Sequence, residues 1–339
     1  MKSVSSTLSL LCVSLSVVMS LSASAQKAPP PPTGMYAATH PFAIATATTS
    51  RLFGMGGFAT CIPDAGFGNP AFAGTLTDTT AVLRQSTTSF STGLQLTGQQ
   101  VSVATPIRVN KSGLQVTGFR LSTDDTLPAA VPPGNTSTFS EYELAFHYGQ
   151  RFGDRLVLGV GLSPVFHSAI VNSFPTGDNL FRLRSSSDQG FRVGGLYNLG
   201  PSSWLGAVYD RYDEDVIASG PAYGGGSLPF SYTSDEMVIG LSRKLNPNLL
   251  AAVEWQQLTT EGNGTRQGDS GFRVGIEATL DNNVTFRAGS NDGSLSLGLG
   301  LQSDRLSLNY AFIDNWNKDL VEASLGSSST HQFEAAYHF

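Results

Sequence analysis

Hydrophobic and polar residues alternate one by one along many stretches of about ten residues between residue 80 and the end of the chain. In residues 295–302, leucines alternate with serine, glycine and glutamine, and residues 271–280 repeat the pattern with Phe272, Val274 and Ile276 on the apolar side. Such alternation is typical of a β-strand whose two faces meet different surroundings. It predicts 14 strands, near residues 80–90, 99–108, 113–121, 140–150, 156–167, 190–199, 203–212, 233–243, 248–258, 271–280, 283–290, 295–303, 305–313 and 329–339.

The connections between these strands distinguish two architectures that both produce alternation. In a soluble sandwich the apolar faces pack on each other, whereas in a membrane barrel they face lipid. Every second connection is short, and those between them are mostly long. The short ones are 109–112, 151–155, 200–202, 244–247, 281–282 and 303–304, and the long ones are 122–139, 168–189, 213–232, 259–270 and 314–328. Outer-membrane barrels have short periplasmic turns and longer outer loops. Residues 79–339 are therefore predicted to form an all-β, transmembrane antiparallel β-barrel.

The N-terminal residues indicate export. Residues 1–25 have the features of a cleaved signal peptide, with a basic residue, an apolar run over 8–21 and a small-residue site at 23–25. Residues 26–33 are proline-rich and are interpreted as an extended leader. Together with the barrel pattern, the signal peptide places the protein in a bacterial outer membrane, with membrane lipid as a partner.

The C-terminal residues give a second indication of this location. Phe333, Tyr337 and Phe339 share one face of the last predicted strand, and the chain ends on an aromatic residue. This resembles the terminal strand by which bacterial outer-membrane proteins are recognised for assembly. We therefore expect the barrel assembly machinery to be a partner.

The interior of such a barrel has to be filled or it leaks. Eight strands already give an interior that side chains can fill, and 16 to 18 strands leave an aqueous channel. Residues 34–78 precede the first strand, are rich in small residues and show no sustained period of two. We expect them to form a hatch, a segment that plugs the lumen.

The predicted hatch carries a motif that resembles a known family. The motif consists of Arg51, Gly54-Met55-Gly56-Gly57, Asp64-Ala65 and Asn69-Pro70-Ala71. It is similar to the N-terminal signature of the outer-membrane hydrophobic-compound transporters (FadL, the long-chain fatty-acid transporter, and its PorV-type relatives). The resemblance covers essentially the whole mature chain and implies 14 strands and an N-terminal hatch. Gly68 replaces the usual aromatic before Asn69, and Phe72 replaces the usual glycine after the motif, so no particular relative is indicated.

Two of the long connections are rich in apolar residues. Burying one Phe- or Leu-sized side chain is worth about 1.5–3 kcal/mol, so a loop that exposes several of them needs a partner surface. They either pack on each other or form a groove for a hydrophobic ligand. The resemblance implies a groove, because the third and fourth outer loops of these transporters form a hydrophobic landing site. The candidate groove residues are Phe174, Leu180, Phe181, Ile217, Tyr223, Leu228 and Phe230.

Strand 156–167 contains Gly159, Gly161 and Pro164. Glycine in a strand marks a bulge or a close backbone approach, and proline removes a hydrogen bond from the ladder. The three residues are consistent with an ordinary irregular rim. They are also consistent with a local gap, and the resemblance implies such a gap as a lateral exit into the membrane.

Charged residues occur in two groups. The acidic residues Asp210, Asp213, Glu214 and Asp215 either form a solvated loop or supply oxygen ligands for Ca²⁺, although their spacing is not that of an EF-hand. A second group lies on the inward faces of the C-terminal strands: Glu254, Arg273, Glu277, Arg287 and Glu334. Opposite charges on neighbouring strands pair across a sheet, so we expect this group to form a polar wall that hydrogen-bonds the hatch, with an ion filter as the alternative.

Composition narrows the chemistry. Only 14% of the residues are charged, the net charge is −6, and no Lys/Arg cluster occurs, which argues against nucleic acid as a partner. His167, with Ser163 and Ser168 nearby, is the one place where a rim hydrolase could be considered, and we favour the interpretation that it is a polar girdle residue. We expect no enzyme activity, cofactor or metal. Cys61 is the only cysteine after the signal peptide, so no internal disulfide is expected.

These features predict an outer-membrane protein that passes fatty-acid-like hydrophobic molecules by passive diffusion through a plugged barrel. The main alternative is a PorV-like barrel that binds an exported protein or secretion machinery. A general porin is a further alternative, against which the predicted hatch argues.

Overall fold

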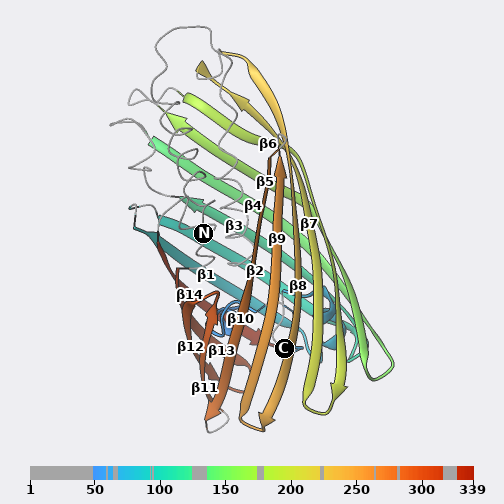
Figure 1. The fold of residues 1–339 in the computed structure, drawn as a ribbon. Helices are drawn as coiled ribbons and strands as arrows, with labels where there is room; N and C mark the ends of the chain where they lie inside the picture. The colour runs from blue at the N-terminus through green and yellow to red at the C-terminus, as the bar shows by residue number, and fades with distance from the viewer. Residues whose placement is uncertain are drawn as a thin grey trace, which may run out of the picture.

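The computed structural model describes residues 49–58, 60–63, 68–91, 93, 95–123, 136–173, 179–221, 225–262, 265–280, 283–315 and 327–339 (Figure 1). The predicted signal peptide, the leader and residues 34–48, 59 and 64–67 of the predicted hatch, which include Asp64-Ala65 of the motif, lie outside these residues. The described elements are α3 (Ser50–Gly54), the 3-10 helix η1 (Pro70–Thr75), β1 (Thr80–Phe90), β2 (Gln95–Arg108), β3 (Ser112–Thr123), β4 (Thr136–Phe152), β5 (Leu156–Ser173), β6 (Asn179–Gly200), β7 (Ser203–Ser219), β8 (Ser227–Asn246), β9 (Leu249–Gly262), β10 (Thr265–Leu280), β11 (Val284–Asn291), β12 (Ser294–Gln302), β13 (Leu306–Asp314) and β14 (Ser328–His338).

The strands form one closed antiparallel barrel in which each strand pairs with its neighbours in the sequence. The barrel closes between β1 and β14, with the register running from Thr80↔His338 to Phe90↔Ser328. Each of the 14 predicted strands coincides with an observed one, so the predicted fold class is confirmed. Among the described residues, no helix has the length and apolar character needed to cross a membrane.

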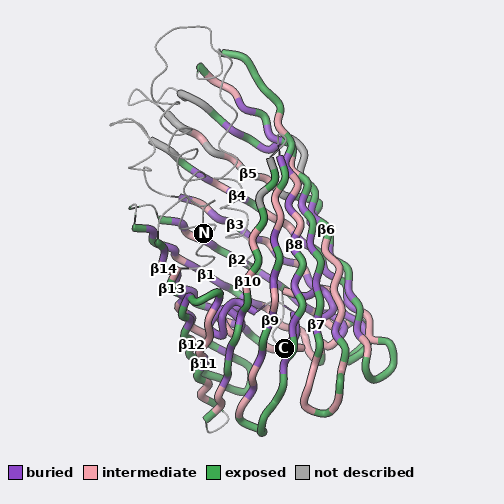
Figure 2. Tube along the Cα trace, viewed as in Figure 1, coloured by how far each residue is buried: buried purple, intermediate pink, exposed green. Residues whose placement is uncertain are grey.

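Buried and exposed residues alternate along the strands (Figure 2). Many of the exposed residues are large and apolar, whereas many of the buried ones are small or polar. On β12, Leu295 is 53% exposed and Leu297 is 47% exposed, whereas Ser296 between them is fully buried. A sandwich would bury the leucines instead. Apolar side chains point outward because lipid is the solvent of that face.

The barrel wall is much taller on one side than on the other (Figure 1). Strands β5 to β8 have 18, 22, 17 and 20 residues, whereas β11, β12 and β13 have 8, 9 and 9. The tall side corrects one prediction, because most of the expected outer loops 168–189 and 213–232 are strand. The β7–β8 ladder continues without interruption from Ser203↔Arg243 to Ser219↔Ser227.

The outer parts of β7 and β8 carry polar side chains on their outward face. On β7 the outward residues change from Tyr209 to Arg211 and Asp213, and the Arg211 guanidinium donates to both carboxylate oxygens of Asp213 at 3.0 and 3.1 Å. The Tyr209 hydroxyl donates to Asp235 on β8 at 2.5 Å. Backbone pairing therefore continues with polar side chains on the outer face. This is expected of the part of the sheet that extends beyond the membrane into water.

Candidate functional site

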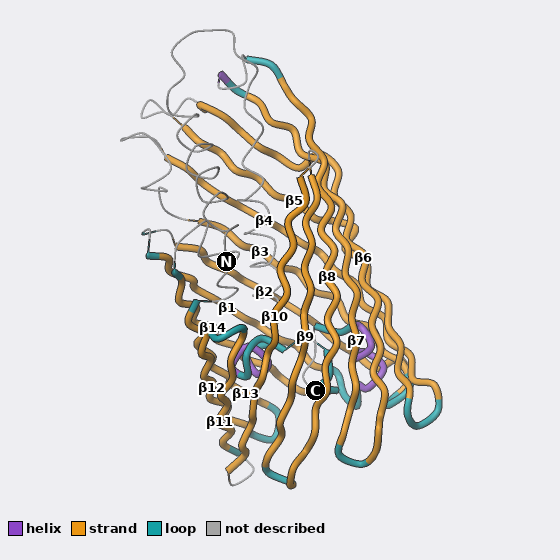
Figure 3. Tube along the Cα trace, viewed as in Figure 1, coloured by secondary structure: helices purple, strands orange, loops and turns teal. Residues whose placement is uncertain are grey.

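The described residues between 49 and 79, which we call the inner segment, lie inside the lower half of the barrel (Figure 3). Helix α3 contacts β11 to β14, and η1 contacts β2 to β6. Thr49 caps α3, its hydroxyl accepting a hydrogen bond from the Leu52 amide at 3.2 Å. The chain then turns through Gly56 and Gly57, whose φ values of 115° and 80° suit glycine. This is the reason for the Gly-Gly pair in the motif.

Asn69 fixes the second bend of the inner segment. Its side chain is fully buried, and its Oδ1 accepts from the Ala71 amide at 3.0 Å, which caps η1. Its Nδ2 donates to the carbonyl of Thr60 at 3.0 Å and to that of Gly195 on β6 at 3.1 Å. Pro70 follows at the first position of η1, where no amide hydrogen is needed. Asn69-Pro70-Ala71 therefore shapes the inner segment and also attaches it to the barrel wall.

Glycines on the inner wall allow the backbone of the inner segment to approach closely. A Cβ added to any of these glycines would lie within 3.1 Å of an atom of the inner segment: Gly113, Gly149, Gly159, Gly194, Gly206, Gly240, Gly275, Gly289 and Gly298. They come from β3 to β8 and from β10 to β12, so they surround the inner segment. A larger side chain at most of these positions would force backbone atoms apart. We call this set the glycine ring.

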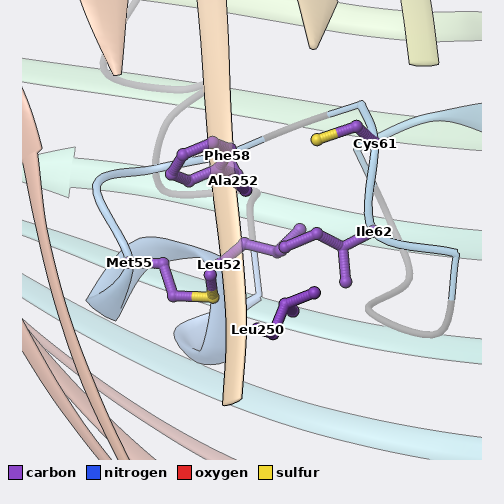
Figure 4. Close-up of a cluster of buried hydrophobic side chains, with 7 residues drawn as sticks. All are labelled: Leu52, Met55, Phe58, Cys61, Ile62, Leu250 and Ala252. Atoms are coloured by element: carbon purple, nitrogen blue, oxygen red, sulfur yellow. The ribbon is translucent and has the colours of Figure 1, made fainter. Parts of the chain in front are cut away.

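Apolar contacts complete the packing of the inner segment. Figure 4 shows a cluster in which the side chains of α3 and the following turns meet the inward face of β9. Its members, all at most 8% exposed, are Leu52, Met55, Phe58, Cys61, Ile62, Leu250 and Ala252. A second cluster joins Ala71 and Phe72 to Val157 of β5 and Leu196 of β6. Burial of this size stabilises docking, since each large side chain contributes about 1.5–3 kcal/mol.

Hydrogen-bonded side chains join the inner segment to the C-terminal strands. The Arg51 Nε and Nη2 atoms donate to the two carboxylate oxygens of Glu277 on β10, at 2.7 and 2.6 Å. Glu277 Oε2 also accepts from Nε of Arg287 on β11 at 2.7 Å, and Arg287 Nη1 donates to Asn309 on β13 at 2.9 Å. The predicted inward pairing of Glu277 and Arg287 is confirmed.

This network continues across the closing pair of strands. Asn309 donates to one oxygen of Glu334 on β14 at 3.2 Å, and Arg84 on β1 donates to the other oxygen at 2.7 Å. The Ser50 amide donates to that same oxygen at 3.1 Å. Arg84 also donates to Gln100 on β2 at 2.5 Å. The inner segment is therefore bonded to the strands that close the barrel.

Glu254 and Arg273 hold the other side of the inner segment. The Thr60 amide donates to Glu254 on β9 at 2.7 Å, and Arg273 on β10 donates to the Gly57 carbonyl at 2.8 Å. All five residues of the predicted polar wall are thus inward, buried and connected to each other or to the inner segment. This is the structural role expected of them.

A further polar layer lies on the tall side of the lumen. Arg192 on β6 donates to Asp210 on β7, with the Nε–Oδ2 distance at 2.6 Å. Glu143 on β4 accepts from the Ser163 hydroxyl at 2.5 Å and from the Tyr212 hydroxyl at 2.9 Å. Buried charges at this position are stabilised only while they remain paired. Together with the network around Glu277 and Glu334, we call this layer the charged belt.

Beyond the charged belt, the inner wall becomes more apolar. On β3 the inward residues change from Gln115 and Thr117 to Phe119 and Leu121, and on β9 they change from Gln256 to Leu258. The inward apolar residues at the outer ends of the strands, which we call the apolar rim, are Phe90, Leu96, Phe119, Leu121, Phe139, Leu183, Val216 and Leu258. Each is at most 5% exposed. The inner wall therefore carries more large apolar side chains at its outer end than below, with the buried polar residues Thr88, Thr123 and Glu141 directly opposite Leu96 and Leu121.

Of the seven predicted groove residues, the structure describes the side chains of only three, Ile217, Leu228 and Phe230. Phe174 and Tyr223 lie outside the described residues, and only the backbone of Leu180 and Phe181 is described, on β6. Ile217, on β7, is 40% exposed and points outward, because its neighbours Val216 and Ala218 are buried inside. Leu228 and Phe230 pair with Ala218 and Val216, which places them on the inward face of β8.

Sequence reasoning therefore missed the apolar rim, although a signal for it was present. The relevant residues have the inward parity of their strands but are apolar, unlike the glycine, serine and charged residues nearer the middle. The signal is that inward-facing positions change from polar to apolar residues towards the outer ends of the strands. The period of two along each strand does not change there.

The ladder between β5 and β6 is interrupted at Pro164. Leu156–Ser163 pair with Gly190–Tyr197, and Ala169–Ser173 pair with Asn179–Arg184, but no pair joins 164–168 to 185–189. The His167 Nδ1 and the Ser185 Oγ are 2.7 Å apart across this interruption. Proline has no amide hydrogen to donate, and Pro164 is the first residue of the interruption.

The other two lateral-gap candidates lie below the interruption and have a packing role. A Cβ at Gly159 would overlap the backbone of Pro70 and Ala71, and a Cβ at Gly161 would lie 2.5 Å from Cδ2 of His147. Both glycines are thus explained by close approach. Only Pro164 among the three candidates is at the interruption.

The four acidic residues considered as a cation site do not form a cluster. Asp210 points into the lumen, where it binds Arg192, whereas Asp213 points outward to Arg211. Asp215 also points outward and accepts from Ser231 at 2.6 Å. Alternation along β7 separates residues that are adjacent in the sequence. Within the described part of the chain, no group of three His, Cys, Asp or Glu residues could hold a metal ion.

Cys61 is buried in the inner segment. Its carbonyl accepts from the Ser242 hydroxyl of β8 at 2.6 Å. The pKa of the Cys61 thiol is raised well above its ordinary value. The main cause is burial, and the second is the negative charge of Glu254. The thiol is therefore protonated and unreactive while the inner segment is docked.

Comparison with solved structures defines the class of fold. The chain is similar to the CymD monoaromatic hydrocarbon channel, with a TM-score of 0.60 and 14% sequence identity over 87% of this chain and 98% of that one. It is equally similar to the Ralstonia pickettii toluene transporter TbuX, with a TM-score of 0.60 and 14% identity over 87% and 99% of the two chains. A Pseudomonas aeruginosa FadL homologue aligns with a TM-score of 0.57 and 12% identity over 86% and 98%.

The fold is thus that of the FadL-type hydrophobic-compound channels, and the resemblance predicted from the inner-segment motif is confirmed at the level of the fold. No protein-family model matches the sequence, and neither does any curated protein.

Proposed function

We propose that this protein lies in a bacterial outer membrane and lets hydrophobic small molecules cross it by passive diffusion. The observation that carries the proposal is the apolar rim, an inward-facing set of large apolar side chains at the outer end of the lumen. A lumen that conducts water and ions has no need of such a lining. An apolar solute that enters the rim gains roughly 25 cal/mol for each Å² of its apolar surface that leaves water.

The same solute would not continue straight down the barrel. The charged belt and the inner segment lie below the rim, and their polar groups are bonded to one another. Inserting an apolar molecule there would break those bonds without replacing them, at about 1–3 kcal/mol for each buried group left unpaired. We propose that the inner segment acts as the hatch expected from the sequence.

The interruption between β5 and β6 offers a sideways exit. Backbone hydrogen bonds seal an intact barrel wall, and between residues 164–168 and 185–189 these bonds are missing. Opening this place would require loss of the His167–Ser185 contact but no break in the ladder. We propose that solutes leave the lumen here and enter the membrane, with the concentration gradient as the only driving force.

A pair of neighbouring residues on β7 provides the test. Val216 belongs to the apolar rim and Ile217 points outward at the same height. Val216→Asp is expected to lower uptake about tenfold or more, because an unpaired carboxylate in an apolar site costs at least about 1.4 kcal/mol. Ile217→Asp should transport normally. Uptake of radiolabelled oleate and toluene is measured in cells that lack other such channels, with assembly checked by heat-modifiable gel migration.

The rival functions give different results in the same strains. If the barrel binds an exported protein, neither oleate nor toluene uptake depends on it, and a pull-down from membranes recovers a stoichiometric protein partner. If it is a general porin, the pure intact protein conducts ions in a planar bilayer. Either result would replace the transport proposal.

A further inference from the structure

Three exposed arginines lie on the outward face of the sheet between β3 and β6: Arg120, Arg182 and Arg184. Arg120 is opposite Tyr142, which is 42% exposed, and its guanidinium carbon lies 5.7 Å from the centre of the Tyr142 ring. Arg184 is opposite Ile217, which also points outward. Arg182 is two residues from Arg184 on the same strand, so it shares this face. We call the three arginines the basic patch.

The basic patch begins where the apolar outer face of the barrel ends. The outward residues of β5 are large and apolar from Leu158 to Val165, and His167, opposite Tyr142, is the next described residue on that face. A strand with about 3.3 Å per residue and a tilt of about 40° rises roughly 23 Å from the start of β5 to Val165. The apolar band of an outer-membrane barrel is about 25 Å tall. Tyr142 and the Arg120 guanidinium beside its ring therefore lie at the outer interface of the membrane.

The other two arginines lie further out on β6. The exposed apolar residues described on the outward face of this strand end at Phe191, and Arg184 and Arg182 come well beyond it. At this height the outward face meets the headgroups of the outer leaflet and the water above them. The basic patch thus extends from the interface into the headgroup layer.

The positive charges of the basic patch are not neutralised within the described part of the chain. Above the apolar band, the described outward residues of β3 to β6 include no carboxylate, and none of the three arginines forms an ion pair with a described residue. The neighbouring strands differ, because Arg211 on β7 pairs with Asp213 at 3.0 Å and with Asp235 at 3.7 Å. Clustered basic residues beside a membrane attract anionic lipid headgroups.

The spacing within the basic patch selects an anion with more than one phosphate. Arg182 and Arg184 are alternate residues of one strand, about 7 Å apart, so their long side chains can bind the same phosphate. Arg120 is three strands away from Arg184, which at about 4.8 Å per strand separates them by roughly 14 Å or more. One phosphate cannot contact both ends of the patch. A phospholipid with a single phosphate would therefore use only part of it.

We propose that the basic patch binds a glycolipid of the outer leaflet that carries two phosphates, one at Arg120 and the other at Arg182 and Arg184. Guanidinium groups bind phosphate through pairs of parallel hydrogen bonds, which makes arginine well suited to this headgroup. The acyl chains would extend towards the bilayer centre over the exposed apolar side chains of Phe146 and Leu162. The proposal rests on the outer-membrane location proposed above, and it does not depend on transport.

The test uses the full-length protein in mild detergent, with lipid A as the probe, because lipid A is an acylated disaccharide with two phosphates. Native mass spectrometry measures the lipid-bound fraction, and the intact protein is expected to bind one molecule. Arg182→Gln combined with Arg184→Gln should lower this fraction about fivefold or more, because the charge at one end of the patch is lost. Arg211→Gln is the matched control and should bind normally, since Arg211 is also outward and exposed but is already paired with Asp213.

Arg120→Gln tests the other end of the basic patch and should also lower binding about fivefold. Monophosphoryl lipid A should bind the intact protein about fivefold less than the form with two phosphates. Heat-modifiable gel migration shows that each variant is assembled. Equal binding of lipid A by the intact protein and by either patch variant would overturn the proposal, and so would equal binding of the two lipids. Toluene uptake by the same variants is a separate measurement, so failure of the transport proposal would be seen independently.

Discussion

Two neighbouring glycines on β6 provide a test of how the inner segment docks. Gly194 faces the inner segment and Gly195 faces away from it, so the same substitution can be made on either face of the strand. A Cβ at Gly194 would lie 2.9 Å from Asn69 Cγ and from Pro70 Cδ, and closer still to Asn69 Oδ1. A Cβ at Gly195 would be no nearer than 3.5 Å to any atom. Valine is favoured in strands, so neither Gly194→Val nor Gly195→Val should harm the barrel itself. The first is expected to displace Asn69, and the second is the control.

The magnitude follows from the bonds that Asn69 makes. Its side chain forms three hydrogen bonds of 3.0–3.1 Å, to Ala71, Thr60 and Gly195. At about 0.5–1.5 kcal/mol each, their loss weakens docking by about 1.5–4.5 kcal/mol. This raises the undocked fraction between about 10-fold and about 2000-fold.

Planar-bilayer conductance measures the undocked fraction, because a barrel without its plug conducts ions. The Gly194→Val protein should show frequent openings, whereas the Gly195→Val and intact proteins stay closed. Heat-modifiable gel migration confirms that all three are assembled. If the assembled Gly194→Val protein conducts no more than Gly195→Val, the inner segment is not the plug.

Three further predictions concern single sites. Cys61 should resist maleimide in the folded protein, even at mildly alkaline pH, because its raised pKa keeps the thiol protonated; it should react on unfolding, and rapid labelling of the native protein would contradict the docked geometry. Glu277→Gln should lower the temperature of the gel shift, since loss of one partner from a buried ion pair costs about 3–5 kcal/mol; an unchanged temperature would show that the bonds to Arg51 contribute little. A protease site inserted at Gly225 should be cut on intact cells and one at Pro247 protected, and the reverse would invert the barrel.

The membrane-spanning strands were predictable because lipid imposes a strict alternation on them. Outside the lipid this constraint ends. Arg211, Asp213 and Asp215 replace the outward apolar residues of β7, so the alternation disappears while the backbone pairing continues. The tall outer half of the wall was for that reason interpreted as loop, and Ile217 was grouped with residues on the opposite face.

The site was predictable in kind but not in its partners. Inward charges on neighbouring strands predict ion pairs, and Glu277 with Arg287 forms one. The bond of Glu334 to the Ser50 amide could not be predicted, because the two residues meet only when the barrel closes around the inner segment. The glycine ring could not be predicted for a similar reason. The alternation pattern shows only that Gly194 and Gly206 are small inward residues, and it does not show that the inner segment contacts them.

A reversible cross-link across the β5–β6 interruption tests the account most directly. In a protein with His167→Cys and Ser185→Cys, oxidation should join the two strands where their ladder is open, and Cys61 is too buried to compete. The control is Leu162→Cys with Phe191→Cys, a directly opposite pair in the intact part of the same ladder. The account predicts that toluene uptake falls on oxidation of the 167–185 pair, returns on reduction, and does not change in the control. Full uptake by the cross-linked 167–185 protein would contradict it.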